Sequence, residues 1–248
     1  MPCDYDVIIV GAGHAGTEAA VMSARLGAKT LLLTSNLDTI GQLSCNPAIG
    51  GIAKGTVVRE IDALGGIMGR ATDRATIQFR MLNRSKGPAV WAPRAQCDRT
   101  LYRRAVRALL ERLPNLELTQ GMVSRLMIEG THAAGVATSD GRVFAARAVV
   151  ITAGTFLRGR IHLGTDTQIP AGRAGEQPAV EVANTLNHLD LQCRVSRPAR
   201  RRGWTAARSI GPRSSGRTVT RPRTASPSLN ASSGPVRCRA GSRGPVRK

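Results

Sequence analysis

The sequence predicts an α/β, Rossmann-like fold, in which a parallel sheet carries a β-meander insertion, followed by a disordered basic tail. Three observations carry this prediction. Residues 6–10 form an apolar, β-branched run, which is typical of a buried parallel strand. The turn GAGHAG follows at residues 11–16 and precedes a helical pattern over residues 17–26. After residue 196 neither helical nor strand periodicity persists.

The N-terminal stretch has the order strand, glycine turn, helix and strand, with the second strand at residues 30–33. This is the order of a βαβ unit that binds a dinucleotide. Gly11 allows the tight turn, Gly13 allows a pyrophosphate to approach the backbone, and Gly16 allows the helix to pack closely on the strand. The pyrophosphate would lie at the positive end of the helix. The alternative is an ordinary glycine turn between packed elements.

The end of the second strand departs from the pattern of NAD-dependent dehydrogenases. That pattern places Asp or Glu about 20 residues after the glycines, where the carboxylate binds the ribose. This sequence has Thr34, Ser35 and Asn36 there. A ribose would therefore be bound in another way, and the sequence disfavours a plain NAD-dependent dehydrogenase.

The middle of the chain predicts further helices. Residues 52–64 have helical spacing, 71–82 are expected to be helix or helix and loop, and 83–90 a basic loop. Residues 97–113 predict an amphipathic helix. The apolar faces of the first and last of these helices are expected to contain Val57, Val58, Ile61 and Leu64, and Leu101, Ala105, Leu109 and Leu113.

From residue 116 the pattern changes to that of strands. Strands are expected at residues 116–118 and 122–128, and a hairpin joins 133–138 to 142–145. Residues 148–152 predict another buried strand, so that a parallel strand returns after a β-meander. Residues 159–178 are expected to be loop-rich. A short helix is expected at residues 179–189.

Composition narrows the class of protein. The 248 residues contain no apolar run of about 18 residues, so no membrane span is expected, and the acidic N-terminus disfavours a signal peptide. Five scattered cysteines are typical of a reduced, cytoplasmic protein rather than of a disulfide framework. The absence of a C-x-x-C pair or a Cys/His cluster disfavours a zinc site.

The charge is concentrated in the tail. Residues 197–248 hold 14 of the 36 basic residues and none of the 16 acidic residues. A segment so rich in Arg, Ser, Pro and Gly buries too little apolar surface to offset its ordering entropy. We therefore expect one folded domain at residues 1–196 and a disordered tail at residues 197–248.

Seven strings, in order, show a resemblance to a known family. They are DVIIVGAGHAGTEAA (6–20), SCNPAIGG (44–51), EIDALGG (60–66), SKGPAV (85–90), RAQ (94–96), TAGTFL (152–157) and GRAG (172–175). Over residues 4–196 the chain resembles the MnmG/GidA family of FAD proteins, the tRNA uridine 5-carboxymethylaminomethyl modification enzymes. The string containing Cys45 is the most specific of the seven.

The resemblance implies an FAD-binding domain. The full family enzyme uses FAD, NADH and a methylene-tetrahydrofolate one-carbon donor. Together with a GTPase partner, which is MnmE-like, it adds an aminomethyl or carboxymethylaminomethyl group at C5 of the tRNA wobble uridine. A homodimer is expected for the family. The flavin supplies the chemistry, and the protein positions the flavin.

The resemblance also assigns roles to individual residues. FAD pyrophosphate would be held by the turn Gly11, Ala12, Gly13, His14, Ala15 and Gly16. The backbone of Val123 would contact FAD on the adenine side, and Gly154 belongs to a second flavin-contact turn. Cys45 would lie near the isoalloxazine as an acid/base or a nucleophile, for which a thiolate is required. Lys86 and Arg94, within the matching strings, are candidates for phosphate or flavin contacts.

The tail departs from the family pattern. The family continues beyond Arg197 with a second catalytic cysteine, a nicotinamide-binding insertion, a closing FAD segment and a C-terminal helical domain. The composition of residues 197–248 is that of a GC-rich coding region translated in the wrong frame. Our hypothesis is a frameshift near Arg197 and a truncated chain, which alone is expected not to be catalytically competent.

Two other functions remain open from the sequence. A generic FAD-dependent oxidoreductase would share the glycine turn and the turn at Gly154. A non-specific RNA-binding protein would use the basic tail, whose cations bind phosphates with a steep salt dependence. The tail contains a single aromatic residue, Trp204, so it lacks the stacking surfaces of a sequence-reading protein.

Overall fold

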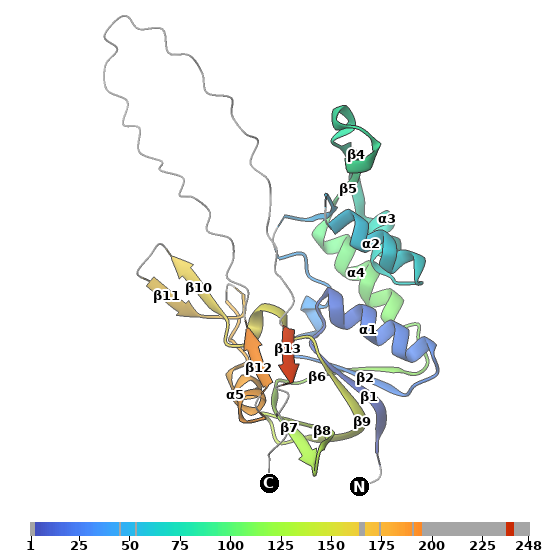
Figure 1. Ribbon diagram of the computed structural model, residues 1–248. Helices are drawn as coiled ribbons and strands as arrows, with labels where there is room; N and C mark the ends of the chain where they lie inside the picture. Colours follow the sequence, from blue (N-terminus) through green and yellow to red (C-terminus); the bar gives the residue numbers. More distant parts are fainter. Residues whose placement is uncertain are drawn as a thin grey trace, which may run out of the picture.

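A six-stranded sheet forms the centre of the computed structural model, which describes residues 3–44, 46–52, 54–163, 167–173, 175–189, 191–194 and 237–240 (Figure 1). The strand order is β6-β2-β1-β9-β8-β7. The bounds are β1 (Tyr5–Val10), β2 (Thr30–Thr34), β6 (Leu116–Gln120), β7 (Val123–Glu129), β8 (His132–Thr138) and β9 (Val143–Ile151). Strand β2 pairs in parallel with both β1 and β6, and β1 pairs in parallel with β9. Strand β8 pairs antiparallel with both β7 and β9. The predicted α/β fold, a parallel sheet with a meander, is confirmed.

Strand β9 replaces two predicted strands. The expectation of separate strands at residues 142–145 and 148–152 is wrong, because one continuous strand changes its partner midway. Residues 143–145 pair antiparallel with β8, and Ala146 to Ile151 pair in parallel with β1, where Val10 lies opposite Ile151. The strand thus joins the meander directly to the parallel half of the sheet.

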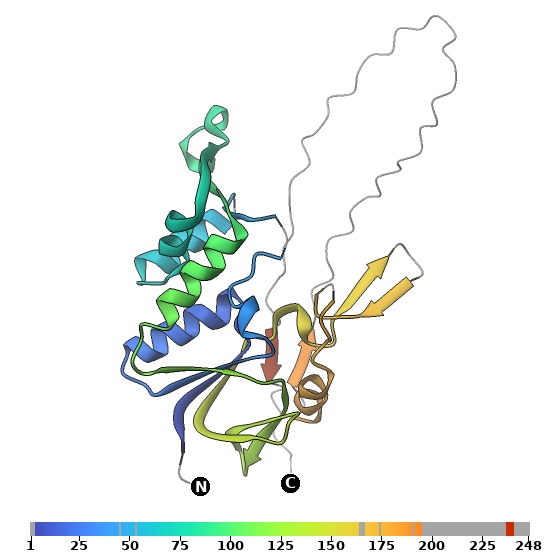
Figure 2. The ribbon, with the colours of Figure 1, turned by 180° about the vertical axis from the view of Figure 1, so that it is seen from behind.

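Helices cover both faces of the sheet (Figures 1 and 2). On one face lie α1 (His14–Arg25) and α4 (Arg99–Leu110), and on the other lies α5 (Val180–His188), with Val182, Ala183 and Leu186 buried. Successive strand residues point to opposite faces. Accordingly Ile9 belongs to the apolar cluster with α1 and α4, and Ile8 to the cluster with α5.

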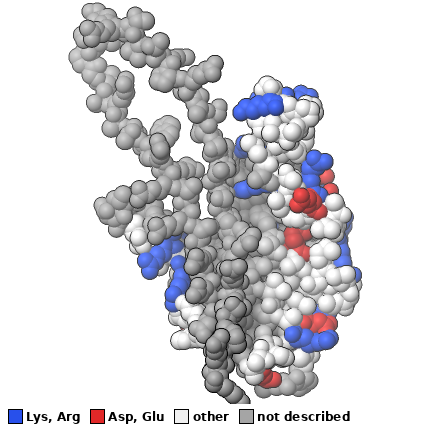
Figure 3. All heavy atoms as spheres, in the orientation of Figure 1, with Lys and Arg blue, Asp and Glu red and all other residues white. Residues whose placement is uncertain are grey.

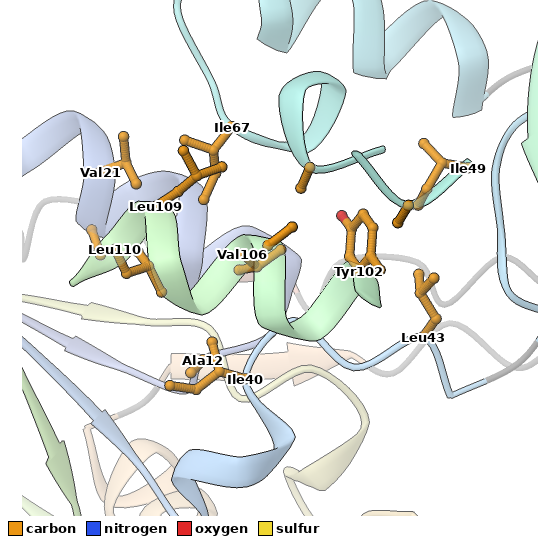
Figure 4. Packing of buried hydrophobic residues seen from close by; sticks show 14 of the residues in the cluster. Ala12, Val21, Ile40, Leu43, Ile49, Ile67, Tyr102, Val106, Leu109 and Leu110 are labelled. Atoms are coloured by element: carbon orange, nitrogen blue, oxygen red, sulfur yellow. The ribbon is translucent and has the colours of Figure 1, made fainter. Parts of the chain in front are cut away.

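Helix α4 packs through Tyr102, Val106, Leu109 and Leu110. Leu109 lies near Ile67 and Val21 of α1, whereas Tyr102 lies near Ile49 and Leu43 (Figure 4). The helix begins at its N-cap Asp98, whose carboxylate accepts a hydrogen bond from the Leu101 N–H at 2.8 Å. The predicted burial of Ala105 and Leu109 is confirmed, but that of Leu101 is wrong, since this residue is 50% exposed. Tyr102 takes its place in the core.

A small antiparallel sheet stands apart from the main sheet, in the order β3-β5-β4. It consists of β3 (Ala48–Gly50), β5 (Ala92–Cys97) and β4 (Thr76–Leu82). The expectation of helix or loop over residues 71–82 is correct only as far as the end of α3 (Met68–Ala75). Pairing with β5 draws the remainder into a strand. The β4–β5 hairpin projects from the body of the molecule (Figures 1 and 2).

Helix α2 (Lys54–Ala63) is mostly exposed, and its predicted apolar face is correct only in part: Val58 and Ile61 are half-buried, and Val58 packs against the core. Val57 and Leu64 are exposed, and Gly55 is the helix's buried residue. Gly55 allows a close approach, because a methyl group there would lie 3.1 Å from the carbonyl oxygen of Pro93 in β5. The next helix, α3, is capped from a distance: the Glu18 carboxylate accepts hydrogen bonds from the N–H groups of Ile67 and Met68.

The C-terminal third contains two further strand pairs. The loop-rich stretch of the prediction contains the hairpin β10 (Arg160–Leu163) and β11 (Thr167–Pro170), and β12 (Leu191–Arg194) pairs antiparallel with β13 (Arg237–Ala240). Apart from β13, which was not predicted, the expected disordered tail at 197–248 lies outside the described residues. None of the helices in the described part of the chain has the length and apolar character that crossing a bilayer requires.

Candidate dinucleotide-binding site

The predicted site residues gather at one edge of the main sheet, at the carboxyl ends of β1, β2 and β9. The glycine turn leaves β1, and the turn containing Gly154 follows β9, which is the neighbour of β1. The crossing from β6 to β7 lies beside the end of β2, because the Gly121 N–H donates to the Thr34 carbonyl at 2.8 Å. Ligands of open α/β sheets bind at this edge.

Gly11 makes the sharp turn off β1. Its φ is +101°, a conformation that other L-residues rarely adopt, and a methyl group there would lie 2.8 Å from the Thr152 carbonyl oxygen. The Thr152 hydroxyl donates to the carbonyl oxygens of Val10 and Gly11 at 2.9 and 2.8 Å. The turn is therefore held from the side by the residue that follows β9.

Gly16 lets α1 pack directly on that turn. A methyl group on Gly16 would overlap the carbonyl oxygen of Gly11 and would lie 2.7 Å from the Thr152 hydroxyl oxygen. The geometry agrees with the packing role predicted for this glycine. The structure also places the Thr152 side chain against the same turn, a contact that the sequence did not predict.

Gly13 faces open space. It is the N-cap of α1, it supplies no side-chain cap, and a methyl group built on it meets nothing within 4 Å. The first N–H groups of the helix, from His14 to Gly16, have no intrahelical acceptor. Together with the helix dipole, these groups make a site for an anion such as a pyrophosphate. Ala15 is exposed beside them and leaves the approach open.

Val123 and Gly154 belong to segments that follow other strands of the sheet: Val123 begins β7, just after the crossing from β6, and Gly154 follows β9. The Val123 side chain is buried in the apolar cluster under α5, so its backbone is the part available to a ligand. Gly154 has a φ of +57°, and a methyl group there would meet nothing within 4 Å. The turn containing Gly154 is tied to a neighbouring loop, since the Thr155 hydroxyl donates to the Gly172 carbonyl at 2.9 Å.

The end of β2 offers no carboxylate, as the sequence predicted. The Asn36 side chain is occupied locally, because its oxygen accepts a hydrogen bond from the Asp38 N–H at 2.8 Å and so caps a short 3₁₀ turn, η1 (Leu37–Thr39). It is therefore not a free substitute for the acidic residue of NAD-dependent dehydrogenases.

His14 turns away from the open side and into the protein. Its ring lies 5.8 Å from that of Tyr102, centroid to centroid, and its Nε2 and the Tyr102 hydroxyl are both buried without a hydrogen-bond partner among the described residues. Burial lowers the pKa of His14, and the positive charge of Lys54 lowers it further. Burial likewise raises the pKa of Tyr102, as does the charge of Glu18. Both side chains are therefore neutral at neutral pH.

This burial predicts a pH dependence of stability. In the unfolded chain His14 regains a pKa of about 6.5, so below that pH the unfolded state binds more protons than the folded state. The free energy of unfolding should therefore fall as the pH is lowered from about 7.5 to about 5.5. Urea unfolding of the wild type and of His14→Phe, which keeps a ring and removes the titration, measures the effect. An equal fall in both proteins would contradict the prediction.

Arg173 was not singled out from the sequence, although it connects several segments near the site. Its guanidinium donates to Gln42 Oε1 at 3.0 Å and to the Ser44 hydroxyl at 3.3 Å, pairs with Glu176 at 3.1 Å, and lies 5.0 Å over the ring of Phe156. The contacts with Gln42 and Ser44 span more than a hundred residues, so no local pattern could reveal them. They tie the loop that precedes residue 45 to the turn that contains Gly154.

Cys45, the predicted catalytic residue, lies outside the described residues. The other two candidates from the matching strings are not at the glycine turn. Lys86 and Arg94 lie on the β4–β5 hairpin, Lys86 in the short turn η2 (Arg84–Lys86) and Arg94 in β5. The structure therefore brings together the predicted cofactor residues and separates them from these two cations.

Comparison with known proteins shows which family this chain belongs to. The family model of glucose inhibited division protein A matches residues 6–197. The tRNA uridine 5-carboxymethylaminomethyl modification enzyme MnmG of Protochlamydia amoebophila (strain UWE25) is 54% identical over 192 residues, which make up 77% of this chain and 31% of that enzyme.

Solved structures agree. GidA of Aquifex aeolicus superposes with a TM-score of 0.72 at 49% identity, over 76% of this chain and 31% of that one. The GidA-related protein of Thermus thermophilus superposes with a TM-score of 0.56 at 26% identity, over 76% of this chain and 70% of that one. The chain thus spans about a third of the length of MnmG and GidA, and over that span it belongs to the glucose inhibited division protein A family.

Proposed function

We propose that this chain binds FAD at the carboxyl edge of the main sheet, with the pyrophosphate at the N-terminus of α1. One observation carries the proposal: Gly13 opens onto free space in front of unsatisfied helix N–H groups, while Gly11 and Gly16 pack against Thr152. The family supports FAD rather than NAD as the dinucleotide.

The open space at Gly13 and the uncapped start of α1 support such a ligand. The turn of Gly11, Ala12, Gly13, His14, Ala15 and Gly16 would hold the pyrophosphate. The backbone of Val123 would meet the adenine side, and Gly154 would form the second contact turn. When bound, FAD supplies the capacity for hydride transfer. His14, buried against Tyr102, acts from inside by holding the first turn of α1 against α4.

The same family assignment supports a proposal for the reaction of the full-length enzyme. We propose that the full-length enzyme adds an aminomethyl or carboxymethylaminomethyl group at C5 of the tRNA wobble uridine. It would do so in the cytoplasm, as a homodimer, with NADH, methylene-tetrahydrofolate and an MnmE-like GTPase partner. Cys45 is the proposed catalytic residue. Because the chain spans 31% of the MnmG relative, the part in this reaction that we propose for it is limited to binding FAD and supplying Cys45.

Titration of the whole chain with FAD tests the proposal. Flavin fluorescence should change saturably as FAD binds, and a large excess of NAD should not displace it. Far-UV circular dichroism of the same sample establishes that the chain is folded. A folded chain that leaves flavin fluorescence unchanged, or that binds NAD in preference to FAD, would overturn the proposal.

A further inference from the structure

The β4–β5 hairpin has an unusual charge distribution. Residues 76–97 contain four cations and no carboxylate. The cations are Arg80, Arg84, Lys86 and Arg94. Figure 3 shows Lys and Arg side chains at the projecting end of the molecule where this hairpin lies. Within the part of the chain that the structure describes, none of the four forms an ion pair.

Two of these cations are direct cross-strand neighbours. In the register of β4 and β5, Arg80 lies opposite Arg94. Side chains in such a pair point to the same face, with Cβ atoms about 5 Å apart, and like charges there destabilise the sheet. A bound anion between the two guanidinium groups would relieve the repulsion. Guanidinium groups bind phosphate through paired, charge-assisted hydrogen bonds.

Two aromatic side chains are exposed on the same hairpin. Phe79 is 64% exposed and Trp91 is 47% exposed. The Trp91 indole N–H donates to the Arg84 carbonyl at 3.2 Å, and the Asn83 amide donates to the Val90 carbonyl at 3.2 Å. The loop is therefore held by its own hydrogen bonds and presents the indole next to the cations. Neither ring is buried in a core that would explain its position.

We propose that the β4–β5 hairpin is a contact surface for single-stranded RNA. Arg80 and Arg94 bind a backbone phosphate, Arg84 and Lys86 add electrostatic attraction, and Trp91 offers a face on which a base stacks. Cations interleaved with exposed aromatic rings suit single-stranded RNA, because every base has a stacking face and every nucleotide a phosphate. The choice of RNA as the polyanion rests on the proposed function in tRNA modification.

Tryptophan fluorescence tests this surface separately from the basic tail. The sequence has two tryptophans, Trp91 and Trp204, so Trp204→Phe in the full chain leaves Trp91 as the only reporter. A short oligouridylate should quench Trp91 fluorescence saturably. Arg80→Gln with Arg94→Gln should weaken the binding that this quenching reports by about tenfold or more and lower the salt slope of log K by about 0.7, as the loss of one neutralised phosphate requires.

A matched control removes the same charge elsewhere. Arg104 and Arg112 are exposed on or just after α4, and Arg104→Gln with Arg112→Gln should leave the quenching affinity within about twofold. Arg80→Lys with Arg94→Lys keeps both charges but loses the paired hydrogen bonds of the guanidinium groups, so it should bind more tightly than the Gln pair and more weakly than the wild type. Circular dichroism of each variant establishes that the hairpin substitutions leave the chain folded.

Several outcomes would overturn the inference. Equal weakening in both Gln pairs would mean that overall charge, not the hairpin, binds the RNA. Binding detected by anisotropy of a labelled oligouridylate without quenching of Trp91 would place the RNA on the tail. FAD titration of the same samples separates this inference from the proposed function: the hairpin variants should bind FAD as the wild type does. A wild-type chain that binds FAD but shows no quenching of Trp91 would contradict the inference that the hairpin binds RNA and would leave the proposed function unaffected.

Discussion

Gly16→Ala should lower the free energy of unfolding by about 3 kcal/mol or more, which is at or above the upper end of the usual cost of overpacking a core. The added methyl group would overlap the Gly11 carbonyl oxygen, and would lie 2.9 Å from the Gly11 carbonyl carbon and 2.7 Å from the Thr152 hydroxyl oxygen. Two of these three atoms are backbone atoms in a turn with φ of +101° at Gly11, so they cannot move aside as a flexible side chain would. Relief requires that α1 separate from the end of β1.

The matched control lies three residues away. Gly13→Ala adds the same methyl group in the same turn, but nothing lies within 4 Å of it, so its cost should stay below about 1 kcal/mol. Urea unfolding followed by circular dichroism compares the two variants with the wild type. Similar unfolding free energies for the two would show that α1 does not pack on the turn as described.

Gly13→Ala should instead weaken FAD binding by about 10- to 100-fold while the chain stays folded. The methyl group occupies the open space in front of the helix N–H groups, where the pyrophosphate is proposed to lie. Loss of one charge-assisted hydrogen bond, worth about 1.5–3 kcal/mol, corresponds to this range. The effect on binding thus separates from the effect on folding, in contrast to Gly16→Ala.

Flavin fluorescence titration of both the wild type and Gly13→Ala measures this difference. The unfolding experiment on the same variant serves as its control, because an unfolded chain would also lose the cofactor. Unchanged FAD affinity in a folded Gly13→Ala variant would mean that the pyrophosphate does not lie against this backbone, and would remove the observation that carries the proposed function.

Local patterns predicted the elements that build the candidate cofactor site. The apolar run of β1, the glycine turn and the helix after it are contiguous, so their periodicity and turn chemistry are visible in a short stretch. The structure starts α1 at His14, three residues before the predicted start, because glycine and histidine carry no apolar periodicity. The resemblance to a family added Val123 and Gly154, which no local pattern marks.

Long-range pairing decided what local patterns could not. Residues 76–82 have no strong strand alternation, and they become β4 because β5 offers a partner. Thr152 supports Gly11 across about 140 residues of chain, through a 2.8 Å hydrogen bond that no spacing rule could anticipate. Tyr102 and His14 meet only because α4 packs on α1.

The sequence by itself therefore determined the fold class, the glycine turn after β1 and the difference in composition between residues 1–196 and the basic tail. Each of these depends on residues close together in the chain, whose conformational preferences and apolar spacing act locally. The tertiary structure decided the single bent strand β9, the exposed face of α2, the burial of His14 and the opposition of Arg80 and Arg94. Each of these depends on which distant segment becomes the neighbour, because burial and strand pairing are properties of contacts rather than of one stretch of chain.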